Sequence, residues 1–231
     1  MNYQAFLDLA KRRRSIYTFT EEPVSHEDIM KALEAVRFAP SGANSQPWEF
    51  IVVRDKETKA KMGEIVKEAT AETKKIELAR TDGIHHPQAY RPVTDSGISA
   101  APALILLCYD PRTAAAYVKV ADGERNLSSG MANATVSLQL AIASLNLGCH
   151  QITTASHGQV AAKFKELLKI PEPLEIYELL AVGHPAVQPD PRIVRELDEM
   201  VHYESYDKAK FRTNEQVVSF IKEIHTKRTY R

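Results

Sequence analysis

The sequence predicts one mixed α/β domain spanning residues 1–231, with an extension at its C-terminal end from residue 184. Short apolar runs of strand length are interleaved with segments in which apolar residues recur every three or four positions, as on one face of a helix. After residue 184 prolines become frequent, which marks an extended linker. A chain of 231 residues can bury a sizeable core without disulfides or metals.

Two amphipathic helices open the chain. Apolar residues recur from Tyr3 to Ala10 on one face, and this helix runs into a basic stretch at 11–14, where cations offset the helix dipole. Ser25, followed by Asp28, is a variant of the capping box and predicts the start of the second helix. A Pro-Ser-Gly segment at 40–42 marks the end of that helix.

A strand and a long charged helix follow. The apolar run 50–53 predicts a buried strand, and the heavily charged segment 56–80 predicts a helix with a thin apolar stripe. A loop with glycine and proline fills 81–97. Because a thin stripe docks weakly, we expect residues 56–97 to form a lid. The run 103–109 predicts a second buried strand.

The second half of the domain centres on an apolar helix. Residues 131–147 are apolar almost all round and are followed by Gly148, which predicts a fully buried helix with a glycine cap. Strands are expected at 149–154 and 177–182, with an amphipathic helix between them. A last amphipathic helix near the C-terminus has an apolar face formed by Val217, Phe220, Ile221 and Ile224.

Composition argues against several functional classes. Lys and Arg number 30, as do Asp and Glu, so we expect no polyanionic partner such as nucleic acid. Cys108 and Cys149 lack a ligand spacing, and the adjacent His85 and His86 are poorly placed to share a metal, so no metal site is expected. No signal peptide is visible, and no apolar stretch approaches the roughly 20 residues of a membrane span. We therefore expect a cytoplasmic protein with no membrane partner.

Three stretches carry groups suited to binding a ligand. Arg13-Arg14-Ser15 offers two guanidinium forks and a hydroxyl, which suit a phosphate, although such arginines are also typical of a solvated helix end. The segment 39–48 is either a rigid loop that presents amides to a flat heterocycle or a plain helix-to-strand connection. The segment 148–154 ends in Thr153 and Thr154. Their hydroxyls are either groups that bind a ligand or present only because threonine favours strands. No dinucleotide, P-loop, zinc-protease or serine-hydrolase motif is present.

Together these stretches resemble the opening of the FMN-dependent nitroreductase family. The resemblance rests on Arg13 to Phe19, Glu22-Pro23-Val24 and Ala39 to Trp48, in this order and spacing, and it continues at 101–106, 147–148, 182–185 and 197–201. It implies an α+β nitroreductase-like fold, with a central, mostly antiparallel sheet flanked by helices. It also implies a homodimer in which the C-terminal extension at 184–231 wraps the partner subunit.

The resemblance further implies that FMN binds between the two subunits. Arg13, Arg14 and Ser15 would hold the phosphate and ribityl, and Arg195, ahead of Arg192, would complete the phosphate site. Tyr17 stands where many relatives carry a Lys or Arg against the flavin ring. The full set implied for the cofactor is Arg13, Arg14, Ser15, Tyr17, Pro40, Ser41, Gly42, Asn44, Gln46, Thr153, Thr154, Arg192 and Arg195, and Ala43 is assigned to the substrate.

We interpret the chain as an FMN-dependent oxidoreductase that transfers hydride from NAD(P)H through flavin N5 to a small oxidised acceptor, namely a nitroaromatic, a quinone or an enone. The cofactor carries the chemistry, so no catalytic acid or base is expected. An alternative is reductive dehalogenation of a halophenol, because 148–155 resembles the iodotyrosine deiodinase branch, with Thr153 or Thr154 against N5. The deiodinase lid grips its substrate with a Glu, a Tyr and a Lys. Here Glu72 is present, but Ile76 stands where the Tyr would fall. A third hypothesis is a non-catalytic module that binds an anion through 12–14.

Overall fold

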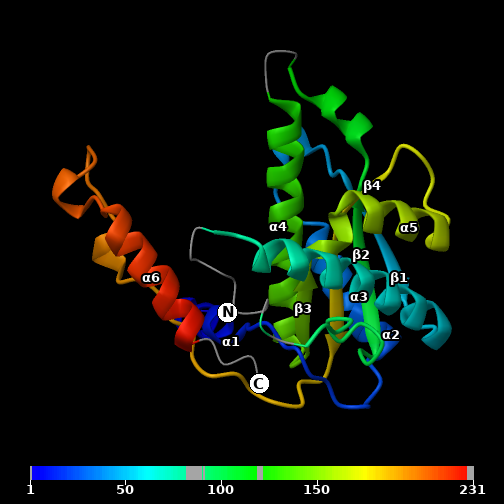
Figure 1. The fold of residues 1–231 in the computed structure, drawn as a ribbon. Coiled ribbons are helices and arrows are strands. Elements are labelled where there is room, and N and C mark those ends of the chain that lie inside the picture. The colour runs from blue at the N-terminus through cyan, green and yellow to red at the C-terminus, as the bar shows by residue number, and fades with distance from the viewer. Residues whose placement is uncertain (1, 82–89, 91, 119–121, 228–231) are drawn as a thin grey trace.

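A four-stranded antiparallel sheet lies at the centre of the computed structural model, which describes residues 2–81, 90, 92–118 and 122–227. Figure 1 shows this sheet among its helices. The strands are β1 (Trp48–Val53), β2 (Ala103–Tyr109), β3 (Gly148–Ile152) and β4 (Glu175–Gly183). They lie in the order β1-β2-β4-β3, and every pair of neighbours is antiparallel. The expected α+β arrangement is confirmed.

Helices cover both faces of the sheet (Figure 1). The helices are α1 (Tyr3–Arg12), α2 (His26–Val36), α3 (Lys56–Leu78), α4 (Gly123–Ser144), α5 (Gly158–Leu168) and α6 (Asn214–Lys227), of which α6 belongs to the C-terminal extension and does not cover the sheet. On one face α2 and α4 form a core with Ile105 and Leu107, and on the other α3 and α5 form a core with Leu104 and Leu106. Successive side chains of β2 thus enter opposite cores, which is why the whole run is apolar. Within the described residues, no helix combines the length and apolarity needed to cross a bilayer.

The first strand is less buried than its sequence predicts. The run 50–53 lies in β1, which begins two residues earlier, at Trp48, and ends the sheet on one side. Because β1 has only one neighbouring strand, its side chains are partly exposed, and Val52 is 38% exposed. The expectation of a fully buried strand at this position is therefore wrong.

The end of α4 also differs from the prediction. The helix ends at Ser144, and Asn146, with φ of 60°, is the residue that turns the chain in the left-handed region. Asparagine tolerates that conformation because its short polar side chain bonds locally. Gly148 instead opens β3, where a Cβ would lie 2.4 Å from Cγ1 of Ile16. This glycine is therefore required by close packing rather than by a helix cap.

Within one chain, α4 is covered on only one side. Leu138 and Ile142 are buried against the sheet, whereas Ala132 and Val136 are exposed, Val136 by 54%. The expectation of a helix buried all round is therefore wrong for a single chain. An apolar stripe remains on its outer face.

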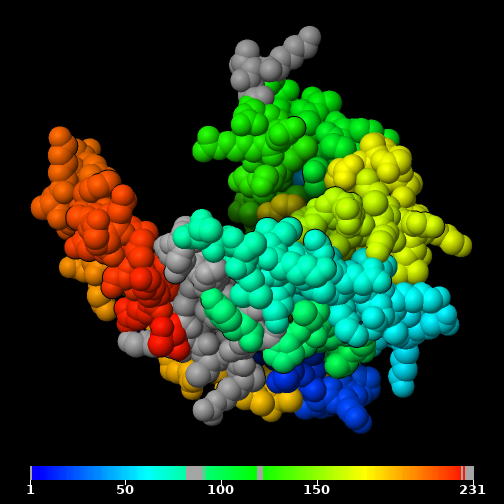
Figure 2. Space-filling view, in the orientation of Figure 1, coloured from blue at the N-terminus to red at the C-terminus, as the bar shows by residue number. Residues whose placement is uncertain are grey.

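The C-terminal extension stands apart from the sheet and its flanking helices, as the orange and red segment shows in Figures 1 and 2. It leaves the domain at Pro185, which pairs with Phe19. The predicted last helix is present as α6. The extension exposes a set of large apolar side chains, namely Val187, Val194, Leu197, Met200, Tyr203, Tyr206 and Phe211. Of the expected lid at 56–97, α3 is described, while 82–89 and 91 lie outside the described residues.

Candidate functional site

α1 delivers three arginines to the edge of the sheet. Arg12 is held by α4, because its guanidinium donates to the carbonyl of Ala143 at 2.8 Å and to Oδ1 of Asn146 at 3.3 Å. Arg13 and Arg14 follow the helix, and among the described residues no group accepts a hydrogen bond from either guanidinium. Arg12 thus anchors α1, and two forked donors are left for an anion.

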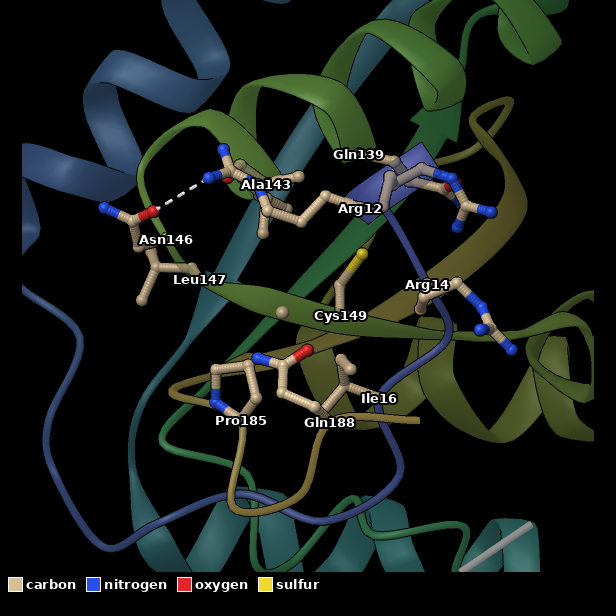
Figure 3. A pocket seen from close by; sticks show the side chains of 13 residues that line it. Arg12, Arg14, Ile16, Gln139, Ala143, Asn146, Leu147, Cys149, Pro185 and Gln188 are labelled. Carbon is tan, nitrogen blue, oxygen red and sulfur yellow. Dashed lines mark hydrogen bonds between the residues drawn. The ribbon is translucent and has the colours of Figure 1, made fainter. Parts of the chain in front are cut away.

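A cleft of about 460 Å³, including its space open to solvent, lies between these arginines and the end of α4 (Figure 3). Arg12 and Arg14 lie on either side of Cys149 in this view. Ile142 and Leu147 give the cleft an apolar wall, and Gln139 adds an amide. The cleft therefore combines cations, an amide and an apolar surface.

The segment after α1 runs along the free edge of β3. Ser15 forms a parallel bridge with Cys149, and the backbone N–H of Ile16 donates to the carbonyl of Cys149 at 2.9 Å. Further along, the ring of Tyr17 lies 4.2 Å from that of His150, measured between centroids. Ser15 and Tyr17 are therefore placed by β3, and Arg13 and Arg14 by their connection to it.

Thr153 and Thr154 lie just beyond β3 rather than within it. The strand ends at Ile152, and residues Thr153–Ser156 form a 3₁₀ turn. The expected alternation of strand side chains therefore stops before the threonines. Neither hydroxyl has a hydrogen-bond partner among the described residues. Because Ser15 is level with Cys149, it lies about 13 Å along the strand from Thr153, at about 3.3 Å per residue.

The two arginines of the extension have different surroundings. The Arg192 guanidinium donates to the carbonyl of Arg13 at 3.5 Å, so it lies at the rim of the basic segment. Arg195 instead donates to the Glu199 carboxylate at 3.3 Å and to its carbonyl at 3.2 Å. In the structure Arg192 therefore lies beside Arg13, whereas Arg195 is bound to Glu199, and the ranking of the two as phosphate ligands stays a prediction.

The loop 40–46 has a strained backbone. Ala43, Asn44 and Gln46 have φ of 49°, 54° and 46°, in the left-handed region that non-glycine residues rarely occupy. Such residues cost on the order of 1–3 kcal/mol each and persist where surrounding contacts fix them. One such contact joins the Gln46 N–H to Oγ of Ser41 at 3.0 Å. Strain of this kind is typical of ligand-binding loops.

This loop lies far from the arginines of its own chain. The carbonyl of Pro40 accepts a hydrogen bond from Nδ2 of Asn133, in the middle of α4, at 2.9 Å, whereas Arg12 is bound to Asn146, just past the C-terminal end of α4. At about 1.5 Å per helical residue, Asn133 and Asn146 are about 20 Å apart. One chain thus brings Arg13, Ser15 and the threonines to β3 and holds the loop 40–46 elsewhere.

Tyr117 is a contact of the loop that the sequence did not indicate, and we expect Tyr117→Phe to loosen the loop. Its Oη shares a hydrogen bond with Oγ of Ser45 at 2.9 Å, and its ring would lie 2.6 Å from a Cβ on Gly42. Removing the hydroxyl costs about 1 kcal/mol and leaves the ring contact in place. Amide hydrogen exchange in a peptide covering 40–47 should accelerate about fivefold. Tyr206→Phe, in the extension, should not change it, and an unchanged rate in Tyr117→Phe would mean that backbone contacts alone hold the loop.

Sequence reasoning also missed Gln139 and Gln188 in the cleft. It named Arg12 only as part of the anion-binding run 12–14, and nothing in that run shows which arginine is bound by α4. A signal for Gln139 was present, because Thr135 and Gln139 are polar residues four apart in an otherwise apolar segment.

The two cysteines are free and buried, and neither serves as a nucleophile. Burial, together with the nearby Glu178 carboxylate, raises the pKa of the Cys149 thiol to about 12. Burial and the charge of Glu49 raise the pKa of the Cys108 thiol to about 11. Both are therefore thiols at neutral pH, whereas nucleophilic chemistry needs the thiolate.

No cluster of three His, Cys, Asp or Glu side chains suited to a metal ion occurs within the described part of the chain. The adjacent His85 and His86 lie outside it. The site is instead formed by arginine, amide and hydroxyl groups beside an apolar wall.

The sequence model of the nitroreductase family matches residues 10–184, three quarters of the chain. The chain belongs to the nitroreductase family. The matched range holds Arg13, Arg14 and Ser15, the loop 40–46 and both threonines. It excludes the extension that carries Arg192.

Individual relatives of this nitroreductase-family chain differ in how much of it they cover. An FMN reductase (NAD(P)H) of Bacillus subtilis is 29% identical over 209 residues, 84% of this chain and 71% of that protein. Iodotyrosine deiodinase 1 of Rattus norvegicus is 44% identical over 68 residues, 29% of this chain and 24% of that protein. A solved iodotyrosine deiodinase bound to FMN and 3-iodo-L-tyrosine has a TM-score of 0.70 at 24% identity, covering 87% of this chain and 99% of that one. This last likeness shows the shared fold.

Proposed function

We propose that the chain is an FMN-dependent oxidoreductase that passes hydride from NAD(P)H through flavin N5 to a small oxidised acceptor, namely a nitroaromatic, a quinone or an enone. The observation that carries the proposal is the pair of guanidiniums, Arg13 and Arg14, which have no partner in the described part of the chain and lie beside Ser15 at the rim of the cleft in a nitroreductase-family chain. Two forked cations and a hydroxyl suit a phosphate monoester. The name of the similar Bacillus subtilis protein, FMN reductase (NAD(P)H), supports the choice of both cofactors.

The residues along β3 fit FMN from one end of the strand to the other. Arg13, Arg14 and Ser15 would bind the phosphate and ribityl, with Arg192 as the further cation. Thr153 and Thr154, about 13 Å along the strand, would face the flavin ring. When bound, FMN would supply hydride transfer at N5. The protein binds the cofactor, orients the reactants and shields them from water, so none of its side chains is required as a catalytic acid or base.

A second copy of the chain would complete the site. The loop 40–46 lies about 20 Å along α4 from the arginines of its own chain, so a partner must bring its loop to the cofactor. Two surfaces are open for that partner: the stripe with Ala132 and Val136 on α4, and the apolar side chains of the extension. We therefore infer a homodimer in which the loop 40–46 of one subunit faces Arg13 and Arg14 of the other. Its interface should exceed roughly 2,000 Å² in total.

We expect Thr153→Ala and Thr154→Ala to differ in their effect on the flavin midpoint potential. Adjacent residues of a 3₁₀ turn point about a third of a turn apart, so only one hydroxyl faces N5. Losing that contact should cost about 1 kcal/mol in the one-electron reduced flavin, where N5 carries a hydrogen, and so change the one-electron potentials measurably, while the affinity for oxidised FMN stays nearly intact. Spectroelectrochemical titration of the flavin-loaded variants measures this.

Ser156→Ala is the matched control for the threonines, because its hydroxyl lies in the same turn and donates to the carbonyl of Thr153 at 2.9 Å. It should leave the potential unchanged. If neither threonine variant shifts the potential, a backbone group meets N5, and the assignment of Thr153 and Thr154 is lost.

Reductive dehalogenation of a halophenol is the second candidate, supported by the 68 residues that are 44% identical to rat iodotyrosine deiodinase 1. The helix α3 weakens this candidate. Glu72, which would grip an amino acid head group, pairs with Lys75 at 3.1 Å, and Ile76 is 65% exposed. Comparing turnover of a halotyrosine with that of a nitroaromatic, under one reductant, decides between the two acceptors.

The decisive experiment is to purify the chain and record its visible spectrum. A yellow protein whose flavin, once released, is identified as FMN, and which oxidises NAD(P)H when a nitroaromatic is added, supports the proposed function. A colourless protein that cannot be reconstituted with FMN would instead support the anion-binding module at 12–14.

A further inference from the structure

Glu178 is a buried carboxylate for which the proposed function gives no role. It is 2% exposed on β4, and no cation among the described residues pairs with it. One carboxylate oxygen accepts a hydrogen bond from the Thr135 hydroxyl of α4, and the other accepts from Nε2 of Gln151 on β3. Burial raises its pKa, while these two hydrogen bonds act in the opposite direction. An acceptor fixed in the interior in this way orients the donors around it.

The carboxylate sets the direction of a chain of amides. Gln151 turns its NH₂ toward Glu178 and its carbonyl oxygen away, which is the orientation that an ionised carboxylate, an acceptor and not a donor, favours. That oxygen accepts from Nε2 of Gln139 at 3.1 Å. Because Gln139 turns its NH₂ toward Gln151, its own carbonyl oxygen points away from Gln151. Glu178 thus decides amide orientations that the two glutamines alone would leave open.

Gln139 is where this chain of hydrogen bonds reaches the cleft. Its side chain lines the same cleft as Arg13 and Arg14, and Figure 3 shows Gln139 together with Arg14. Among the described residues, no donor binds its carbonyl oxygen. Guanidiniums donate to anions, whereas a carbonyl oxygen accepts from a hydroxyl. The two kinds of group together match a ligand that carries a phosphate and hydroxyls.

We propose that Gln139 binds a hydroxyl of the ribityl chain and that Glu178, acting through Gln151, is the residue that positions it. This inference rests on the proposed function, because it assigns one more contact to the same cofactor. In this assignment the arginines bind the phosphate of FMN, and the oriented amide of Gln139 binds its ribityl chain.

The test is to titrate the apoprotein with FMN and with riboflavin, which has the polyol and lacks the phosphate, and to follow flavin fluorescence. Gln139→Leu should weaken both ligands by about fivefold, the value of one neutral hydrogen bond. Arg13→Ala, in contrast, should weaken FMN alone. Glu178→Gln should also weaken both ligands measurably, though by no more than Gln139→Leu does, because a glutamine at 178 donates as well as accepts and releases the amide orientation.

The double variant Gln139→Leu with Glu178→Gln distinguishes positioning from general damage. If Glu178 acts through Gln139, the double variant binds as Gln139→Leu does, whereas independent effects multiply. Thr135→Val is the control, because it removes the other bond to Glu178 and should leave both affinities unchanged. Unchanged riboflavin affinity in Gln139→Leu or in Glu178→Gln, or multiplying effects, overturns the inference while the proposed function stands. Wild-type protein that binds neither flavin overturns both.

Discussion

The variant that carries both Arg13→Ala and Arg14→Ala is expected to lose FMN on dilution. Each guanidinium has no partner among the described residues, so its hydrogen bonds are available for the phosphate. A charge-assisted hydrogen bond contributes about 1.5–3 kcal/mol, so the double variant should bind FMN about a hundredfold more weakly or worse. Fluorescence titration of the apoprotein measures the change.

Lys11→Ala is the matched control, since Lys11 precedes the same segment and its removal changes the local charge without touching the proposed site. It should bind FMN as the wild type does. Arg12 is unsuitable as a control, because it anchors α1 to Ala143 and Asn146. If the double variant retains wild-type affinity, the phosphate lies elsewhere and the assignment of Arg13 and Arg14 is wrong.

Val136→Glu is expected to give a monomer that no longer holds FMN. Val136 lies in the apolar stripe on the outer face of α4, and a two-fold axis would place an unpaired carboxylate from each subunit in the interface. Sedimentation at low micromolar concentration should show the monomer. Val52→Glu is the control, because Val52 is an exposed valine on β1, at the opposite edge of the sheet from β3, and should leave the dimer intact.

A mixing experiment tests whether two subunits share each site. The double variant Asn44→Gly with Gln46→Gly removes two side-chain amides from the loop, and glycine still allows the left-handed backbone there. This loop variant and the Arg13/Arg14 variant should each bind FMN poorly when alone. After subunit exchange in equal amounts, about a quarter of the sites would combine an intact loop with intact arginines, and binding should return in proportion. A flavin-bound monomer of Val136→Glu, or no recovery on mixing, would show that one chain forms the whole site.

Much of the local structure could be predicted because its causes are local. Ser25 caps α2 as expected, since its hydroxyl accepts from the N–H of Asp28 at 2.9 Å, three residues away. The run 103–109 is apolar throughout because successive side chains of the strand enter opposite cores. The threonines at 153 and 154 show the limit of such reasoning. Their β-propensity extends the predicted strand by two residues, but β4 pairs with β3 only as far as Ile152.

The candidate site was recognisable as three separate stretches, and their arrangement was not. Arg13, Arg14 and Ser15 could be marked as phosphate ligands from residue type alone. Their position on the edge of β3 follows from a bridge between Ser15 and Cys149, residues more than a hundred positions apart. Similarly, the resemblance favoured Arg195, whereas the fold places Arg192 at the carbonyl of Arg13.

By itself, then, the sequence determined the family, the order of helices and strands, and the residue types available for a phosphate and a flat ring. Tertiary structure alone decided which arginine is bound by α4, how far the loop 40–46 lies from the arginines, and that Glu178, Gln151 and Gln139 form one chain of hydrogen bonds. The physical reason is that periodicity and capping depend on neighbours within one turn or one strand. Contacts between distant segments depend on strand register and on which helix face meets the sheet, and only the folded chain fixes these.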